Sequence, residues 1–86
     1  MDINKNSTLY KRYVNVIAEA DKLGNLTPIY LRWEDNQLFK IDKIIEIRQS
    51  VSRVGGNGIL YRVRIQNRER HLFYEINRWF IESYTP

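Results

Sequence analysis

The side chains that could perform catalysis are few in this chain, and the first to consider is its single histidine, His71. The sequence has no cysteine. Any Ser-His-Asp or Cys-His arrangement would therefore depend wholly on His71, for which the sequence shows no nucleophilic partner. One imidazole without thiolates also leaves a transition metal short of ligands. We predict a non-catalytic protein with no metal and no cofactor, in which His71 is an ordinary surface residue.

Paired carboxylates are the next possible chemistry, either as general acid and base or as ligands of a hard cation. The pairs are Glu34 with Asp35, and Asp42 with Glu46. The first pair is typical of an ordinary turn. The second shares a strand face with Arg48, which favours a solvated, salt-bridged surface. We assign no catalytic or metal role to either pair.

The glycine-rich stretch over residues 55–58 could cradle a phosphate. It matches neither the P-loop spacing nor the dinucleotide-binding spacing, and no helix follows it. We read residues 50–58 as the longest loop and as a flexible hairpin connection. The alternative is a loop that carries Arg53 and closes over a partner.

The strongest binding signal is the predicted hairpin over residues 59–75. With its turn centred on Asn67-Arg68, Arg62 faces Phe73 and Arg64 faces His71 across the two strands, on the outer face. Guanidinium groups bind phosphates and rings stack on unpaired bases, so this face is a candidate platform for single-stranded nucleic acid or RNA. Its residues are Arg53, Arg62, Arg64, His71 and Phe73. A one-residue change of register would instead bury Phe73 and leave a salt-bridged face.

Trp33 and Trp79 carry the second functional hypothesis, a protein-interaction module. Src-homology-3-like barrels hold proline-rich peptides between aromatic rings, and an unpaired sheet edge can also recruit a partner. In a domain this small, two tryptophans can equally be core anchors. A homo-oligomer formed by edge pairing is a variant of this hypothesis, and the sequence leaves the oligomeric state open.

The elements that must position these residues read as strands. Alternating polarity over residues 13–20 predicts a half-buried strand, followed by a turn at Gly24. Asn36 is the expected left-handed residue of the next turn, and a bulge is expected near residues 42–44. Further strands follow over residues 28–33, 38–48, 59–65, 70–75 and 79–82. In the stretch 38–48, Leu38, Ile41 and Ile45 also fit a helical stripe, but the β-branched isoleucines favour strand. The pattern predicts an all-β fold, a small antiparallel barrel or roll of about five to six short strands, Src-homology-3-like or similar.

Length and charge limit the number of domains and the kinds of partner that this chain can have. We expect 86 residues to form one domain, with a flexible N-terminal arm over residues 1–12 and a single small β domain over residues 13–86. Fourteen basic against ten acidic residues give a net charge of +4, which permits binding to phosphates or acidic surfaces. No apolar run reaches the length of a membrane span or a signal sequence, so we expect a cytoplasmic protein without membrane contact.

Five segments together resemble a known group of proteins. They are PIYLRWED (28–35), FKIDK (39–43), GGNGILYRV (55–63), LFYE (72–75) and WF (79–80). In combination, over roughly residues 14–83, the chain resembles a family of small uncharacterised β proteins of Gram-positive bacteria. The resemblance implies a compact β fold in a bacterial cytoplasm, and it brings no activity and no functional residues.

Overall fold

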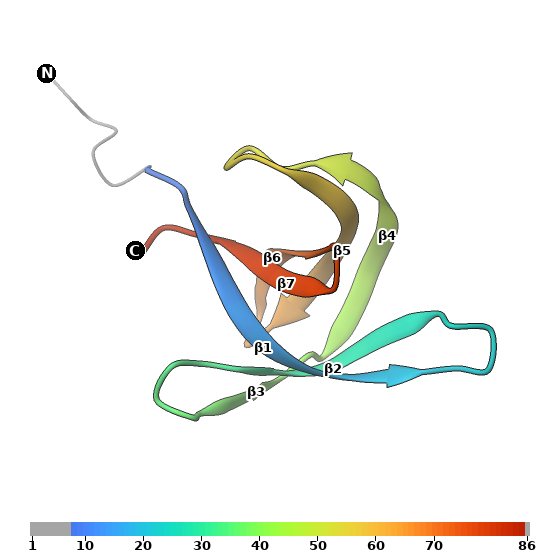
Figure 1. The fold of residues 1–86 in the computed structure, drawn as a ribbon. Coiled ribbons are helices and arrows are strands. Elements are labelled where there is room, and N and C mark those ends of the chain that lie inside the picture. Colours follow the sequence, from blue (N-terminus) through green and yellow to red (C-terminus); the bar gives the residue numbers. More distant parts are fainter. Residues whose placement is uncertain (1–7, 86) are drawn as a thin grey trace, which may run out of the picture.

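The computed structural model describes residues 8–85, which form seven antiparallel β-strands (Figure 1). The all-β prediction is confirmed, although five to six strands was too low a number. The strands are β1 (Tyr10–Ala20), β2 (Leu26–Arg32), β3 (Leu38–Lys40), β4 (Lys43–Val51), β5 (Asn57–Ile65), β6 (Arg68–Glu75) and β7 (Arg78–Ser83). They form one sheet in the order β3-β2-β1-β7-β6-β5-β4. None of the described residues forms a helix of the length and apolarity that a membrane crossing requires.

The sheet is strongly curled, like an open half-barrel (Figure 1). The first half of β1 pairs with β7 and its second half pairs with β2. Between β3 and β4 the chain passes from one edge strand of the sheet to the other within two residues. The Ile41 N–H donates to the Ile29 carbonyl in β2, and the Asp42 N–H donates to the Arg64 carbonyl in β5, both at 2.9 Å. The curl thus creates an inner, concave face and an outer, convex face.

The core has two parts, one on each face of β5, β6 and β7. The larger cluster lies on the inner face, and its buried members are Leu31, Ile41, Tyr61, Val63, Ile65, Leu72 and Ile81. The smaller cluster consists of Leu60, Phe73 and Phe80, with Val54 of the β4–β5 loop packed against it. Neighbouring residues such as Leu72 and Phe73 are both buried, because both faces of the three strands are covered.

The turn of the β5–β6 hairpin lies one residue earlier than predicted, so each cross-strand partner is shifted by two residues and the side chains keep their predicted faces. The turn consists of Gln66 and Asn67, with left-handed φ values of 50° and 64°, which is the geometry of a two-residue hairpin. Arg62 therefore faces His71. The expectation that Phe73 is an exposed ring on the outer face is wrong: its exposed fraction is 1%.

Other predicted boundaries were partly correct. The half-buried alternation in β1 is confirmed, and so are the left-handed Gly24 and Asn36. The register shift in β4 falls between Ile44 and Glu46, slightly beyond the predicted position. The β4–β5 loop spans only residues 52–56, so residues 50–58 were too wide a range. Of the predicted arm over residues 1–12, residues 10–12 belong to β1, and residues 1–7 lie outside the described residues.

The Glu75 side chain at the end of β6 interacts with both the start of β5 and the start of β1. Its carboxylate accepts the Asn57 backbone N–H at 2.8 Å and forms an ion pair with Lys11 at 3.4 Å. The Asn57 N–H and, secondarily, the Lys11 charge hold the pKa of the Glu75 carboxyl below its usual value. The carboxylate form therefore stabilises the folded state.

Replacing Glu75 with glutamine is expected to lower stability at pH 7 and to flatten the loss of stability in acid. A pKa lowered by folding contributes stability above the unfolded-state value of about 4.3, and that contribution is lost as the pH falls through the folded-state pKa. Thermal unfolding midpoints from pH 7 to pH 3 would measure both effects. Parallel curves for the wild type and Glu75→Gln would show that Glu75 does not carry this pH dependence.

Candidate functional site

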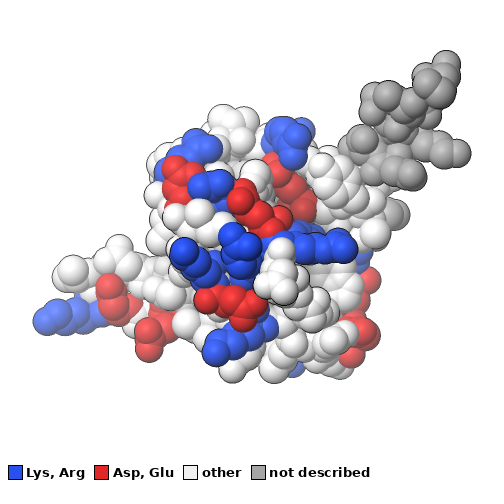
Figure 2. Space-filling view, turned by 180° about the vertical axis from the view of Figure 1, so that it is seen from behind, with Lys and Arg blue, Asp and Glu red and all other residues white. Residues whose placement is uncertain are grey.

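The outer face of the β5–β6 hairpin carries the predicted cations, but its central arginine is already paired. The Arg62 guanidinium lies 3.1 Å from Glu46 in β4 and 3.0 Å from Glu69 in β6. The Arg62 bond is the largest cause that lowers the pKa of the Glu69 carboxyl. Arg64, opposite Glu69 in register, is exposed. Basic and acidic side chains are likewise interspersed over the face seen in Figure 2. Arg62 is therefore a partly neutralised cation.

A buried carboxylate, Glu82 of β7, organises the other predicted residues. Its side chain is 5% exposed and accepts the Ser52 hydroxyl at 2.8 Å and the Arg53 backbone N–H at 3.1 Å. The His71 Nδ1 atom lies 3.2 Å from the same carboxylate, and its Nε2 atom lies 3.3 Å from Glu69. Both imidazole nitrogens thus face carboxylates, and neither has a hydroxyl partner among the residues that the structure describes. Glu82 holds the β4–β5 loop, with Arg53, against the sheet.

Two arginines that the sequence reasoning missed lie on the inner face. Arg68 stands opposite Ile65 and Arg70 stands opposite Val63, so both share the face of the main core. Among residues 8–85, neither guanidinium has an ion pair or a hydrogen bond. Burial, and secondarily the charge of Arg68, lower the pKa of Arg70. A partly buried cation beside a like charge favours an anion as its ligand.

These two arginines line a hollow that also reaches Gln66 in the β5–β6 turn, and we call it the mouth hollow. Its volume is about 400 Å³. Apart from the two arginines, most of its wall is apolar or aromatic. The lining residues are Leu31, Trp33, Phe39, Ile65, Gln66, Arg68, Arg70 and Ile81. The mouth hollow therefore combines two guanidinium groups with two aromatic side chains.

A second hollow lies beside the first, and we call it the histidine hollow. Its volume is about 350 Å³. Arg68 and Arg70 line it as well, together with Arg53, His71 and the carboxylates of Glu69 and Glu82. Two of the five residues predicted to bind nucleic acid, Arg53 and His71, therefore lie in the same hollow as Arg68 and Arg70. Arg62 and Arg64 do not line it, and Phe73 is buried.

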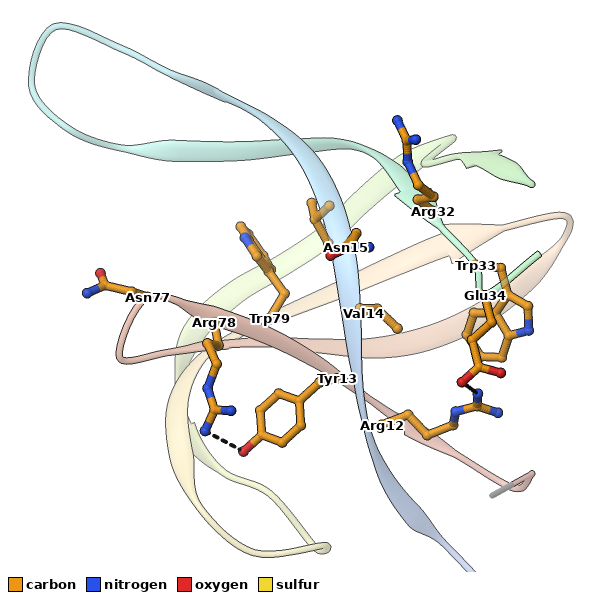
Figure 3. A pocket seen from close by; sticks show the side chains of 11 residues that line it. Arg12, Tyr13, Val14, Asn15, Arg32, Trp33, Glu34, Asn77, Arg78 and Trp79 are labelled. Atoms are coloured by element: carbon orange, nitrogen blue, oxygen red, sulfur yellow. Dashed lines mark hydrogen bonds and ion pairs between the residues drawn. The ribbon is translucent and has the colours of Figure 1, made fainter. Parts of the chain in front are cut away.

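The third hollow crosses β1 and contains both predicted tryptophans, so we call it the tryptophan hollow (Figure 3). Its volume is about 390 Å³. The Arg12 guanidinium lies 4.5 Å from the centroid of the Trp33 ring. Trp79 packs against Tyr61 and Tyr74, with centroid separations of 5.2 and 4.8 Å. The two tryptophan side chains therefore pack against the core and also line the same hollow.

The side chains of these hollows suit anions and planar rings as ligands. Guanidinium groups form charge-assisted hydrogen bonds with phosphates and carboxylates, and aromatic faces accept planar rings. Within residues 8–85, no three histidine or acidic side chains are grouped so that they could hold a metal ion. The fold and the hollows define a small all-β domain with an unpartnered arginine pair beside aromatic side chains.

No protein-family model, no curated protein and no solved structure matches the chain. The resemblance to β proteins of Gram-positive bacteria stays a prediction. Arguments about function therefore start from the hollows themselves.

Proposed function

We propose that this protein is a non-catalytic domain that binds single-stranded nucleic acid, RNA or DNA, at the mouth hollow. The observation that carries the proposal is the pair Arg68 and Arg70, which lack partners among the described residues and stand beside Trp33 and Phe39. A phosphate would bond to the guanidinium groups, and a base would stack on an aromatic ring. Arg53 in the histidine hollow adds a third guanidinium beside the arginine pair, although it also forms an ion pair with Glu82 at 3.8 Å.

A double charge reversal tests this assignment. Arg68→Glu/Arg70→Glu is expected to weaken binding of a labelled uridine or thymidine dodecamer by at least about thirtyfold, because each lost phosphate contact costs about 1–2 kcal/mol. The slope of log affinity against log salt should shrink by about 1.4, which corresponds to two phosphates of a single strand. Fluorescence anisotropy at several salt concentrations would measure both quantities.

The matched control for this variant is Lys40→Glu/Lys43→Glu, which makes the same change in net charge at two exposed lysines outside the three hollows. It should weaken binding only a fewfold through the general field. Arg64→Glu tests the outer face in the same assay. A larger loss in Arg64→Glu than in the arginine pair would move the site to the outer face. Absence of binding at low salt would refute the nucleic-acid proposal.

A protein-interaction module is the second candidate, and one observation favours it. Trp33 and Trp79 line the same hollow, as a Src-homology-3-like peptide groove requires (Figure 3). Binding of this kind would survive moderate salt and would depend on aromatic contacts, whereas phosphate binding would weaken steeply. Light scattering would show whether the partner is a second copy of the chain.

A further inference from the structure

The three hollows are connected in series by residues that they share. Trp33 lines both the tryptophan hollow and the mouth hollow. Arg68 and Arg70 line both the mouth hollow and the histidine hollow. Each of the other two hollows therefore adjoins the mouth hollow at a side chain that lines both. The mouth hollow is the centre of the series.

We propose that the three hollows form one track that holds a single strand of several nucleotides, with the tryptophan hollow as a second nucleotide-binding subsite. This inference rests on the proposed function and adds the length and path of its ligand. The strand would cross β1 at the tryptophan hollow, place a phosphate on Arg68 and Arg70, and end at the histidine hollow.

The tryptophan hollow has the charge that such a strand requires. Three arginines line it against one acidic residue, Glu34. Glu34 forms an ion pair with Arg12, whereas Arg32 forms no ion pair with any residue of the described chain. Figure 3 shows Arg32 on one side of β1 and Arg78 on the other, so positive charge flanks both sides of the crossing. The net positive lining complements a phosphate backbone.

The same hollow has the stacking surfaces and polar groups that bases require. The Arg78 guanidinium lies 4.0 Å from the centroid of the Tyr13 ring and donates a hydrogen bond to the Tyr13 hydroxyl at 3.1 Å. Bases stack on guanidinium planes as well as on aromatic rings. Asn15 and Asn77 also line the hollow and could bond to base edges (Figure 3).

The alternation of charge and ring along the track selects the ligand class. A single-stranded nucleic acid presents a phosphate and an unpaired base in every repeat, so it matches arginines and aromatic rings in series. An acidic peptide supplies the charge but lacks a planar ring at each repeat. A duplex hides its base faces in the stack. We therefore commit to a single strand as the occupant.

A length series tests the track. Labelled uridine and thymidine oligomers of 2, 4, 6, 8 and 12 nucleotides are titrated by fluorescence anisotropy. Affinity is expected to rise with length until the track is filled, within the range of about 4–16 nucleotides that small single-strand-binding folds occupy. Equal affinities for the 2-mer and the 8-mer would overturn the track and leave the proposed function standing. No binding at any length would refute both.

Arg32→Glu locates the second subsite. It is expected to weaken binding of the 8-mer at least fivefold and to leave binding of the 2-mer at the mouth hollow within twofold of the wild type. Lys22→Glu makes the same charge change at the exposed β1–β2 turn and should alter neither. Arg32→Gln, checked for an unchanged unfolding midpoint, covers the case in which the glutamate disturbs the fold. An unchanged 8-mer affinity in both Arg32 variants would overturn the subsite.

Poly-glutamate serves as the competing polymer. At equal concentration of negative charge, poly-glutamate is expected to displace the labelled 8-mer much less effectively than an unlabelled 8-mer does. The reason is that poly-glutamate has no rings that can stack. Equal displacement would show that the track recognises charge alone, and an acidic peptide would then replace the nucleic acid as the occupant.

Discussion

Replacing Phe73 with alanine is expected to lower the free energy of unfolding by about 3–5 kcal/mol, the usual cost of removing a fully buried ring. Phe73 stacks on Phe80 with a centroid separation of 4.9 Å and an interplanar angle of 6°. Together with Leu60, these rings form the buried part of the outer cluster. A domain of this size is stable by about 4–13 kcal/mol, so the variant should lose much of its stability.

Urea unfolding at 25 °C measures this loss directly. Phe73→Leu should cost less than Phe73→Ala, because leucine fills part of the cavity. Ile47→Ala, at a side chain that is 54% exposed, is the surface control and should change little. If Phe73→Ala cost no more than Ile47→Ala, the ring would be solvent-exposed, and the predicted stacking platform on the outer face would return.

The fold class could be read from the sequence because its signals are local. Alternating polarity marks β1, and small or amide side chains at Gly24 and Asn36 mark turns that need positive φ. The register of the β5–β6 hairpin could not be read in the same way. Gln66-Asn67 and Asn67-Arg68 are both polar dipeptides, and the choice between them depends on packing across the sheet.

The burial of adjacent residues was also hidden from the sequence. Alternation assumes that one face of a strand meets solvent. Here the β4–β5 loop brings Val54 over the outer face, so Phe73 and Leu72 are buried on opposite sides of the same strand. The burial of Phe73 depends on a loop more than fifteen residues away in the chain, and no local sequence pattern indicates it.

The sequence indicated arginines and aromatic rings as candidate binding residues, but not which arginines the fold leaves without acidic neighbours. Whether an arginine is paired depends on its cross-strand neighbours. Arg62 has acidic partners in both adjacent strands, whereas Arg68 and Arg70 face Ile65 and Val63. One signal was present: with a two-residue turn, positions 68 and 70 alternate in phase with Leu72, which places two arginines on an apolar face. The predicted turn at Asn67-Arg68 removed Arg68 from the strand, although Arg70 already shared the apolar face with Leu72 in that register.

Replacing Glu82 with alanine is the second change with a large expected effect, about 2–4 kcal/mol of the free energy of unfolding. The carboxylate is buried and accepts the Ser52 hydroxyl and the Arg53 N–H. Alanine would leave these donors without an acceptor, and bonds to charged groups contribute about 1.5–3 kcal/mol each. Val54 packs on the outer cluster from the same loop, so a loosened loop should also expose Phe73 and Phe80.

Urea unfolding and amide hydrogen exchange together distinguish this role from a general loss of charge. The Arg53 and Val54 amides should exchange much faster in Glu82→Ala, while amides in the middle of β5 and β6 keep their order of protection. Glu69→Ala removes the other carboxylate that faces His71, but Glu69 is exposed, so its loss should be much smaller. Glu82→Gln keeps one acceptor oxygen and should fall between the two. Equal losses in Glu82→Ala and Glu69→Ala, without faster exchange at Arg53, would show that Glu82 does not hold the loop, and Arg53 would then lack a fixed position beside the arginine pair.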